Sequence, residues 1–235
     1  MSGWTQKRFW QIATVVEVTE GYSIELDGKM LKTPAKSNFT VPTMALAKAV
    51  SEEWQAQNED VRPDLMPLTR KVNSALDKVQ PAHLAVATQI AEYGGTDLIC
   101  YRAEAPQALI DRQAAAWDPL LAWAAKQLQA PLVVSHSVMP IEQPSDSLTS
   151  LQLRVEVLSA FELAALHDLV AFSGSLVIGL AATQDLAPID TLWELSRIDE
   201  CWQSDKWGED EGAAADATIK RAAFLSAKLF FDLCQ

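Results

Sequence analysis

The sequence predicts an α+β protein, in which a small β-rich N-terminal domain is followed by a larger, mainly helical domain. Residues 8–41 are rich in β-branched and aromatic residues, which favour strands. Within this stretch, Asp27-Gly28 separates two strand-like runs and is the strongest short-range hairpin signal. From Thr43 onward, apolar residues recur at helical spacing through most of the chain.

The chain is long enough to form one large domain or two small ones. Its 235 residues are 49% hydrophobic and 21% charged, which is the composition of a globular protein with a sizeable core. A domain boundary is expected in the charged, irregular segment 58–64, because boundaries fall in exposed polar linkers. This gives a β-rich domain over residues 1–60 and a helical domain over residues 61–235.

The hairpin signal also predicts a register. A two-residue turn at Asp27-Gly28 places Ile24 opposite Leu31 and Tyr22 opposite Thr33, so that one face of the hairpin stays largely apolar. The segment 39–41 is expected to add a short edge to this sheet.

The helical part begins with a segment in which Met44, Ala47, Val50 and Trp54 share one face. Further helices are expected over residues 67–79, 81–93, 106–128, 147–182 with a break, 189–204 and 210–233. Two extended pieces, 97–102 and 132–138, interrupt them, and the sequence does not assign their pairing partners.

As one continuous helix, segment 189–204 would have two distinct faces. The apolar stripe would contain Leu192, Leu195, Ile198 and Trp202. A separate face would contain Trp193, Ser196, Glu200, Gln203 and Trp207. This second face is either a solvated surface whose tryptophans pack onto neighbouring elements, or a binding face with aromatic anchors around a carboxylate.

The charge distribution narrows the classes of partner. The net charge of −12 would repel nucleic acid and anionic lipid headgroups, so neither is an expected partner. Residues 190–216 hold nine carboxylates against only Arg197 and Lys206. A basic protein partner for the C-terminal part fits this asymmetry.

The sequence gives no signal for membrane insertion or export. The longest apolar run, 169–182, is interrupted by Ser173-Gly174-Ser175 and is too short for a membrane span. The N-terminus lacks an apolar signal core. Cys100, Cys201 and Cys234 form no CxxC pair and are expected to be reduced thiols without metal. A cytoplasmic protein is therefore expected.

Catalytic and cofactor motifs are missing from the sequence. It contains neither a GxxxxGKS/T phosphate loop nor a GxGxxG turn, so we expect no nucleotide and no cofactor. Phe172-Ser173-Gly174-Ser175 lacks the surroundings of a nucleophile elbow. His83, His136 and His167 are far apart in sequence. We expect no catalytic residues, no metal site and no enzymatic activity.

A series of short segments runs in order from residue 8 to about residue 216. The segments are Arg8-Phe9-Trp10, Leu26 to Ala35, Glu53-Trp54, Met66-Pro67-Leu68-Thr69, Asn73, Asp77, Asp97 to Arg102, Arg112-Gln113, Trp117-Asp118-Pro119, Ser173 to Leu176, and Asp199-Glu200 to Trp207-Gly208. In this order and spacing they resemble a known family, the assembly chaperones for the α subunit of the catalytic head of F-type ATP synthase, found in mitochondria and alphaproteobacteria. The tract Glu209 to Ala215 departs from the family by lacking a His-Asp pair associated with mitochondrial members.

The resemblance implies a chaperone that catalyses nothing and holds the new α subunit until the β subunit replaces it. It implies a partner-binding site with Glu200 as the main polar contact, Asp199 and Gln203 in support, and Trp193 and Trp207 as anchors. It also suggests a bacterial, cytoplasmic protein, because the similarity begins almost at Met1 and leaves no room for an import sequence.

Each of these residues also has a purely structural interpretation. Asp199 could pair with Lys206 or Gln203 within its helix, and Trp207 could pack against the helix end. Two other function classes stay open at this point. One is a small-molecule enzyme with a pocket between the two parts, which requires Arg102, Arg112, Asp118 and Glu200 to converge. The other is a general holdase with no fixed client.

Overall fold

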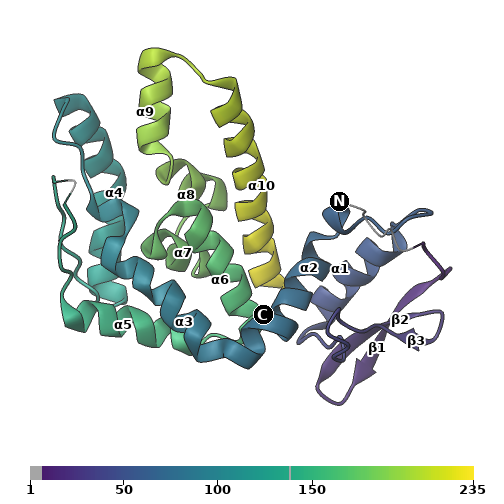
Figure 1. Cartoon of the computed structure of the whole chain (residues 1–235). Coiled ribbons are helices and arrows are strands. Elements are labelled where there is room, and N and C mark those ends of the chain that lie inside the picture. The colour runs from purple at the N-terminus through teal and green to yellow at the C-terminus, as the bar shows by residue number, and fades with distance from the viewer. Residues whose placement is uncertain (1–6, 138) are drawn as a thin grey trace. The chain divides into compact units, whose positions relative to one another are not determined.

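The computed structural model describes residues 7–137 and 139–235 and confirms the predicted fold class (Figure 1). A small antiparallel sheet near the N-terminus is followed by a mainly helical region. The chain divides into two compact units. The first comprises residues up to His83 together with 159–165 and 229–235, and the second comprises 84–158 and 166–228. The division into domains at residue 60 stays a prediction.

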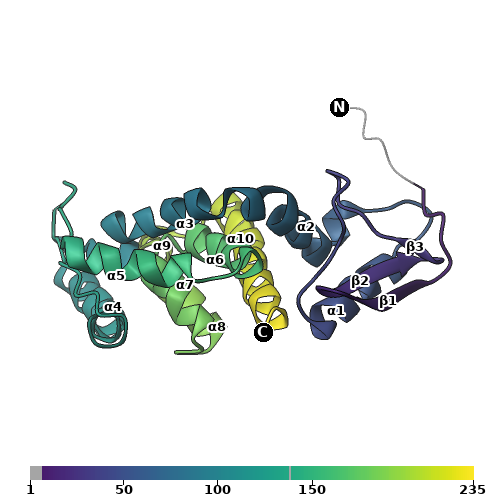
Figure 2. The same ribbon diagram turned by 90° about the horizontal axis from the view of Figure 1, so that it is seen from below.

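The sheet has three strands in the order β1 (Ala13–Val18), β2 (Gly21–Leu26) and β3 (Lys29–Met30), and helix α1 packs against β1 and β2 (Figure 2). Asp27 and Gly28 both have positive φ, 50° and 79°, as a type I′ turn requires. The resulting pair Glu25–Met30 has the predicted register. The Asp27 carboxylate accepts hydrogen bonds from the backbone N–H groups of Gln11 and Ile12, each at 2.9 Å, and these bonds lower its pKa.

The predicted pairing holds near the turn and fails farther from it. Leu31 N donates to Ile24 O at 2.8 Å, as predicted. Tyr22, however, pairs with Val41 and not with Thr33, because the chain turns away from the sheet at Thr33. The Thr33 hydroxyl donates instead to Asp77 at 2.7 Å. The prediction for Tyr22 is therefore wrong, whereas the short edge expected at 39–41 is confirmed.

The core of the first unit joins segments that are distant in sequence. Ile24 and Phe39 from the β-rich part, Val50 from α1 (Met44–Gln55) and Phe230 near the C-terminus are buried in one hydrophobic cluster. Glu53 of α1 accepts hydrogen bonds from the first backbone N–H groups of α2 (Pro67–Ser74), which lack partners within their own helix. This carboxylate fixes the start of α2.

The remaining helices follow the predicted positions with two corrections. They are α3 (His83–Ala91), α4 (Gln107–Gln127), α5 (Ser145–Glu156), α6 (Ala160–Ser173), α7 (Leu176–Thr183), α8 (Ile189–Leu195), α9 (Ile198–Trp207) and α10 (Glu211–Leu233). The segment 147–182 has two breaks where one was expected, and the continuous helix expected over 189–204 is two helices. Within the described residues, no helix is both long enough and apolar enough to cross a membrane.

The two extended pieces pair with each other through a single parallel bridge between Tyr101 and Ser135. The first piece begins as a short 3-10 turn, residues 98–100, and is not extended throughout. The last residue of the second piece, Val138, lies outside the described residues. Asp97 is fully buried at the start of this turn, where it accepts hydrogen bonds from the N–H groups of Ile99 and Val177. It therefore joins the turn to the N-terminus of α7.

Replacing Gly28 with valine should destabilise the first unit. A β-branched residue resists the positive φ of 79° at this position, although no neighbouring atom lies within 4 Å of a new Cβ. The loss should be about 1 to 3 kcal/mol of unfolding free energy, measured by thermal or urea denaturation. An unchanged melting temperature would refute the strained turn.

Asp97 should give the protein an unusual pH dependence. Burial raises the pKa of Asp97 from 3.8 to about 6, so the folded state keeps a proton that the unfolded state has already lost. Stability should therefore fall as pH rises between about 4 and 6, by about 1 to 3 kcal/mol relative to Asp97→Asn. Urea denaturation across this range tests it, and parallel pH profiles for the two proteins would contradict it.

Candidate functional site

The acidic segment around Asp199 and Glu200 is organised by a break between α8 and α9. The Ser196 hydroxyl donates to the Trp193 carbonyl oxygen at 2.6 Å, which closes the last turn of α8. The Trp117 indole of α4 donates to the Leu195 carbonyl oxygen at 2.7 Å. These bonds use carbonyl groups that a continuing helix would have bonded itself. The two continuous faces expected over 189–204 therefore do not exist.

Trp193 is buried and does not form an exposed anchor. Its side chain is only 6% exposed, and its ring packs against Phe224 of α10 with centroids 5.6 Å apart. The Arg197 guanidinium lies over the same ring at 5.6 Å. The structure thus places Trp193 beneath the acidic segment, as its packing support.

Asp199 is tied to α4. Its carboxylate accepts a hydrogen bond of 2.6 Å from the side chain of Gln113, which is itself buried. The Gln113 side-chain oxygen in turn accepts the backbone N–H of Ala103 at 2.8 Å. Neither Lys206 nor Gln203 is the observed partner. Asp199 therefore fixes the first turn of α9, in addition to any role at the surface.

Glu200 lies at the surface and forms an ion pair with Arg197 at 2.7 Å. The Glu200 side chain is 50% exposed, whereas that of Arg197 is 21% exposed. Because the Glu200 carboxylate is half in solvent, this pair contributes little to stability, about 0 to 1 kcal/mol. The carboxylate is therefore accessible to a competing cation.

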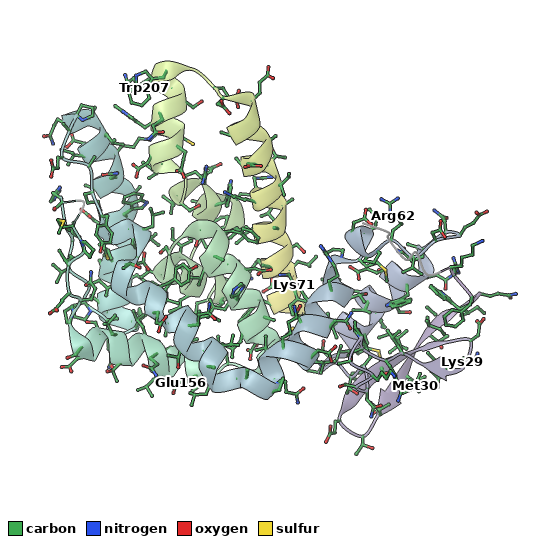
Figure 3. The ribbon with its side chains drawn as sticks, viewed as in Figure 1. Lys29, Met30, Arg62, Lys71, Glu156 and Trp207 are labelled. Atoms are coloured by element: carbon green, nitrogen blue, oxygen red, sulfur yellow. The ribbon has the colours of Figure 1, made fainter. Side chains whose placement is uncertain are left out.

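Gln203 and Trp207 complete the set of predicted residues on α9, and both are exposed. Trp207 is 79% exposed, although a tryptophan ring is usually well buried. Figure 3 shows Trp207 at the end of α9, beside the loop that leads to α10. Four of the five predicted residues thus lie on α9, and three of these are exposed.

A groove of about 230 Å³ lies between α8, α9 and the first turns of α10. Its apolar lining comes from Trp193, Ala213, Ala214 and Ala217, and its charged lining comes from Glu194, Arg197, Glu200, Glu209 and Asp210. Cys201 and Ser204 also line it. Sequence reasoning missed Arg197, Cys201 and the alanines as members of this site. The alanine-rich start of α10 was the available signal, because small residues leave space between helices.

The four residues that an enzyme site required are paired separately. Arg102 binds Asp118 at 2.9 Å, Arg112 binds Asp205 at 3.1 Å, and Glu200 binds Arg197. A second hollow of about 260 Å³ is lined by Arg102 and Asp118 but by neither Arg112 nor Glu200. The convergence that the enzyme alternative required does not occur.

The other residues considered for chemistry have structural hydrogen bonds. The Ser173 hydroxyl donates to the Leu169 carbonyl oxygen at 2.7 Å, and Ser175 caps the N-terminus of α7 by accepting from Ile178 N at 3.0 Å. Among the residues that the structure describes, no group of three or more His, Cys, Asp or Glu side chains is placed to hold a metal ion.

Comparison with known proteins gives consistent matches. The family model described as ATP12 chaperone protein matches residues 7–125. The crystal structure of Atp12 from Paracoccus denitrificans is 45% identical with a TM-score of 0.95, over 97% of this chain and 98% of that chain. A putative chaperone from Agrobacterium tumefaciens is 36% identical with a TM-score of 0.93, over 98% and 87%. Mitochondrial protein atp12 of Schizosaccharomyces pombe is 24% identical over 88% of this chain and 75% of its own length.

The two tryptophans of the site should respond oppositely to truncation. Trp193→Ala removes a buried ring and should cost about 3 to 5 kcal/mol of unfolding free energy. Trp207→Ala removes an exposed ring and should stay within about 0.5 kcal/mol of the parent. Chemical denaturation of both variants checks this. Equal losses would contradict the assignment of one ring to the core and the other to the surface.

Proposed function

The chain belongs to the ATP12 chaperone family, and we propose that it holds the unassembled α subunit of F-type ATP synthase until the β subunit replaces it in the catalytic head. In this proposal the chain catalyses no reaction, and its role is to cover a subunit interface. The observation that carries the proposal is the exposed Trp207, together with accessible carboxylates on the same helix.

An unassembled subunit needs such a partner for physical reasons. The α subunit alternates with β in the assembled ring, so before assembly it exposes a large apolar interface that is prone to aggregate. A chaperone that covers this interface must also release it. Modest binding energy, from a few anchors and exposed charges, suits a complex that another subunit has to displace.

The proposed client-binding surface consists of Glu200, Gln203 and Trp207, with Asp199 and Trp193 behind them. Glu200 supplies the main polar contact, and Trp207 supplies an aromatic anchor of the kind enriched at interface hot spots. Asp199 acts through its bond to Gln113, which holds the first turn of α9 in place. Trp193 acts by packing beneath Arg197.

The proposal extends to the cellular location. The catalytic head faces the cytoplasm in bacteria and the matrix in mitochondria, so its assembly chaperone acts in the same compartment. The mitochondrial relative in Schizosaccharomyces pombe supports this. For this chain the proposed location is the bacterial cytoplasm.

Charge reversal at Glu200 tests the proposed surface. Glu200→Lys should change stability by no more than about 0.5 kcal/mol, since the side chain is half exposed. It should weaken capture of the α subunit by about 2 to 5 kcal/mol, because it places a like charge where the client's cation would bind. Isothermal titration calorimetry with purified α subunit, together with a thermal melt of each variant, measures both quantities.

Asp205→Lys is the matched control, because Asp205 is also an exposed acid of α9 but pairs with Arg112 away from the groove. Its effect on capture should be much smaller. Normal capture by folded Glu200→Lys protein would refute the surface. Equal suppression of aggregation for the α subunit and for unrelated proteins would favour a general holdase.

A further inference from the structure

Arg197 holds the position that a cationic side chain of a partner would take at Glu200. Its guanidinium is 2.7 Å from the Glu200 carboxylate and lies over the buried ring of Trp193. The Arg197 side chain is about four-fifths buried, at 21% exposure. The site is therefore already shaped to hold a guanidinium between an aromatic face and a carboxylate.

The groove that contains this pair is chemically selective. Alanine side chains at the start of α10 make its apolar wall. Four carboxylates line it, from Glu194, Glu200, Glu209 and Asp210, against the single cation of Arg197. This imbalance favours an occupant that is apolar in its body and carries a positive charge.

We propose that Arg197 occupies the place of an arginine of the client. When an apolar client segment enters the groove between α9 and α10, the client's arginine displaces Arg197 from Glu200. This inference rests on the proposed function, since the client is the unassembled α subunit. The exchange replaces one guanidinium–carboxylate pair with another. The net gain is therefore smaller than for binding to a free carboxylate.

Such an internal competitor makes release easier. A site that is open in only a fraction of molecules binds its ligand more weakly by that fraction. When the client leaves, Arg197 returns to Glu200, so that the carboxylate is not left facing an empty groove. The pair thus lowers the affinity for the client to a level from which another subunit can take it.

The chain carries its own reporter for occupancy of the groove. Cys201 lines the groove and is exposed. Burial raises the pKa of Cys100 and of Cys234 to about 12, so these two thiols react slowly with alkylating agents. Alkylation by iodoacetamide in the folded protein therefore reports on Cys201, with Cys201→Ser as the blank.

The decisive test uses two variants that break the same ion pair. Affinity for purified bacterial α subunit is measured for the full-length parent chain, Arg197→Gln and Glu200→Gln, with a thermal melt of each. Arg197→Gln should tighten capture about twofold to fivefold, because the competitor is gone and an ion pair whose carboxylate is half in solvent has an energy of this order. Glu200→Gln should weaken it at least about tenfold, because the client's arginine loses its charged partner.

Arg112→Gln is the matched control, since it breaks an exposed arginine–aspartate pair between α4 and α9 without touching the groove. Its capture should stay within about twofold of the parent. Arg197→Lys keeps the charge and should tighten capture less than Arg197→Gln. If Arg197→Gln does not fold, Arg197→Lys is used in its place.

Bound α subunit should slow Cys201 alkylation at least about tenfold, as burial of a reactive thiol does.

The outcomes separate the two proposals. If the parent chain captures the α subunit but Cys201 reacts at an unchanged rate, the groove is not the site, and only this inference fails. Changes in the same direction for Arg197→Gln and Glu200→Gln would assign the pair a structural role and overturn the exchange. If higher concentrations of the chain alone protect Cys201 from alkylation, the groove binds a second copy of the chain. This result would also overturn the proposed exchange. Failure of the parent to capture the α subunit refutes the proposed function itself.

Discussion

The hydrogen bond from the Trp117 indole to the Leu195 carbonyl oxygen is the constraint on which the site depends. It joins the end of α8 to α4. It also occupies a carbonyl oxygen that a continuing helix would have bonded to its own backbone. Gln113, one turn earlier on α4, holds Asp199 at the start of α9. Two neighbouring side chains of one long helix thus set where α8 ends and where α9 begins. The position of Glu200 relative to the groove follows from these two bonds.

The same constraint explains the limits of prediction from sequence. The hairpin and most helix positions were predictable, because turn residues, proline starts and apolar spacing act locally. The break at Ser196-Arg197 was not, since neither residue is a strong helix breaker and the partner that ends α8 lies 78 residues away. The prediction of the site contains the same error, because it assumed one continuous helix. Glu200, Gln203 and Trp207 lie at the surface, whereas Trp193, which that assumption placed on the same face, is buried. Likewise, the pairing of Tyr22 with Val41 depends on how the chain turns at Thr33.

The energetics of the site fit binding that can be reversed. Trp193 and Asp199 contribute to the fold through a buried ring contact and a hydrogen bond to a buried amide. Glu200 and Trp207 contribute little to the fold and are accessible to a partner. This division lets the surface change its partner without unfolding its support. Arg197 belongs to both groups, because it packs on the core ring and neutralises the exposed acid.

The central claim is that this chain holds the α subunit and gives it up to the β subunit. The most direct measurement is native mass spectrometry of a purified complex before and after addition of β subunit. The account predicts a complex of this chain with the α subunit that disappears as α and β assemble, with the chaperone released free. A complex that persists in the presence of excess β subunit, or a ternary complex that retains the chaperone, would contradict it.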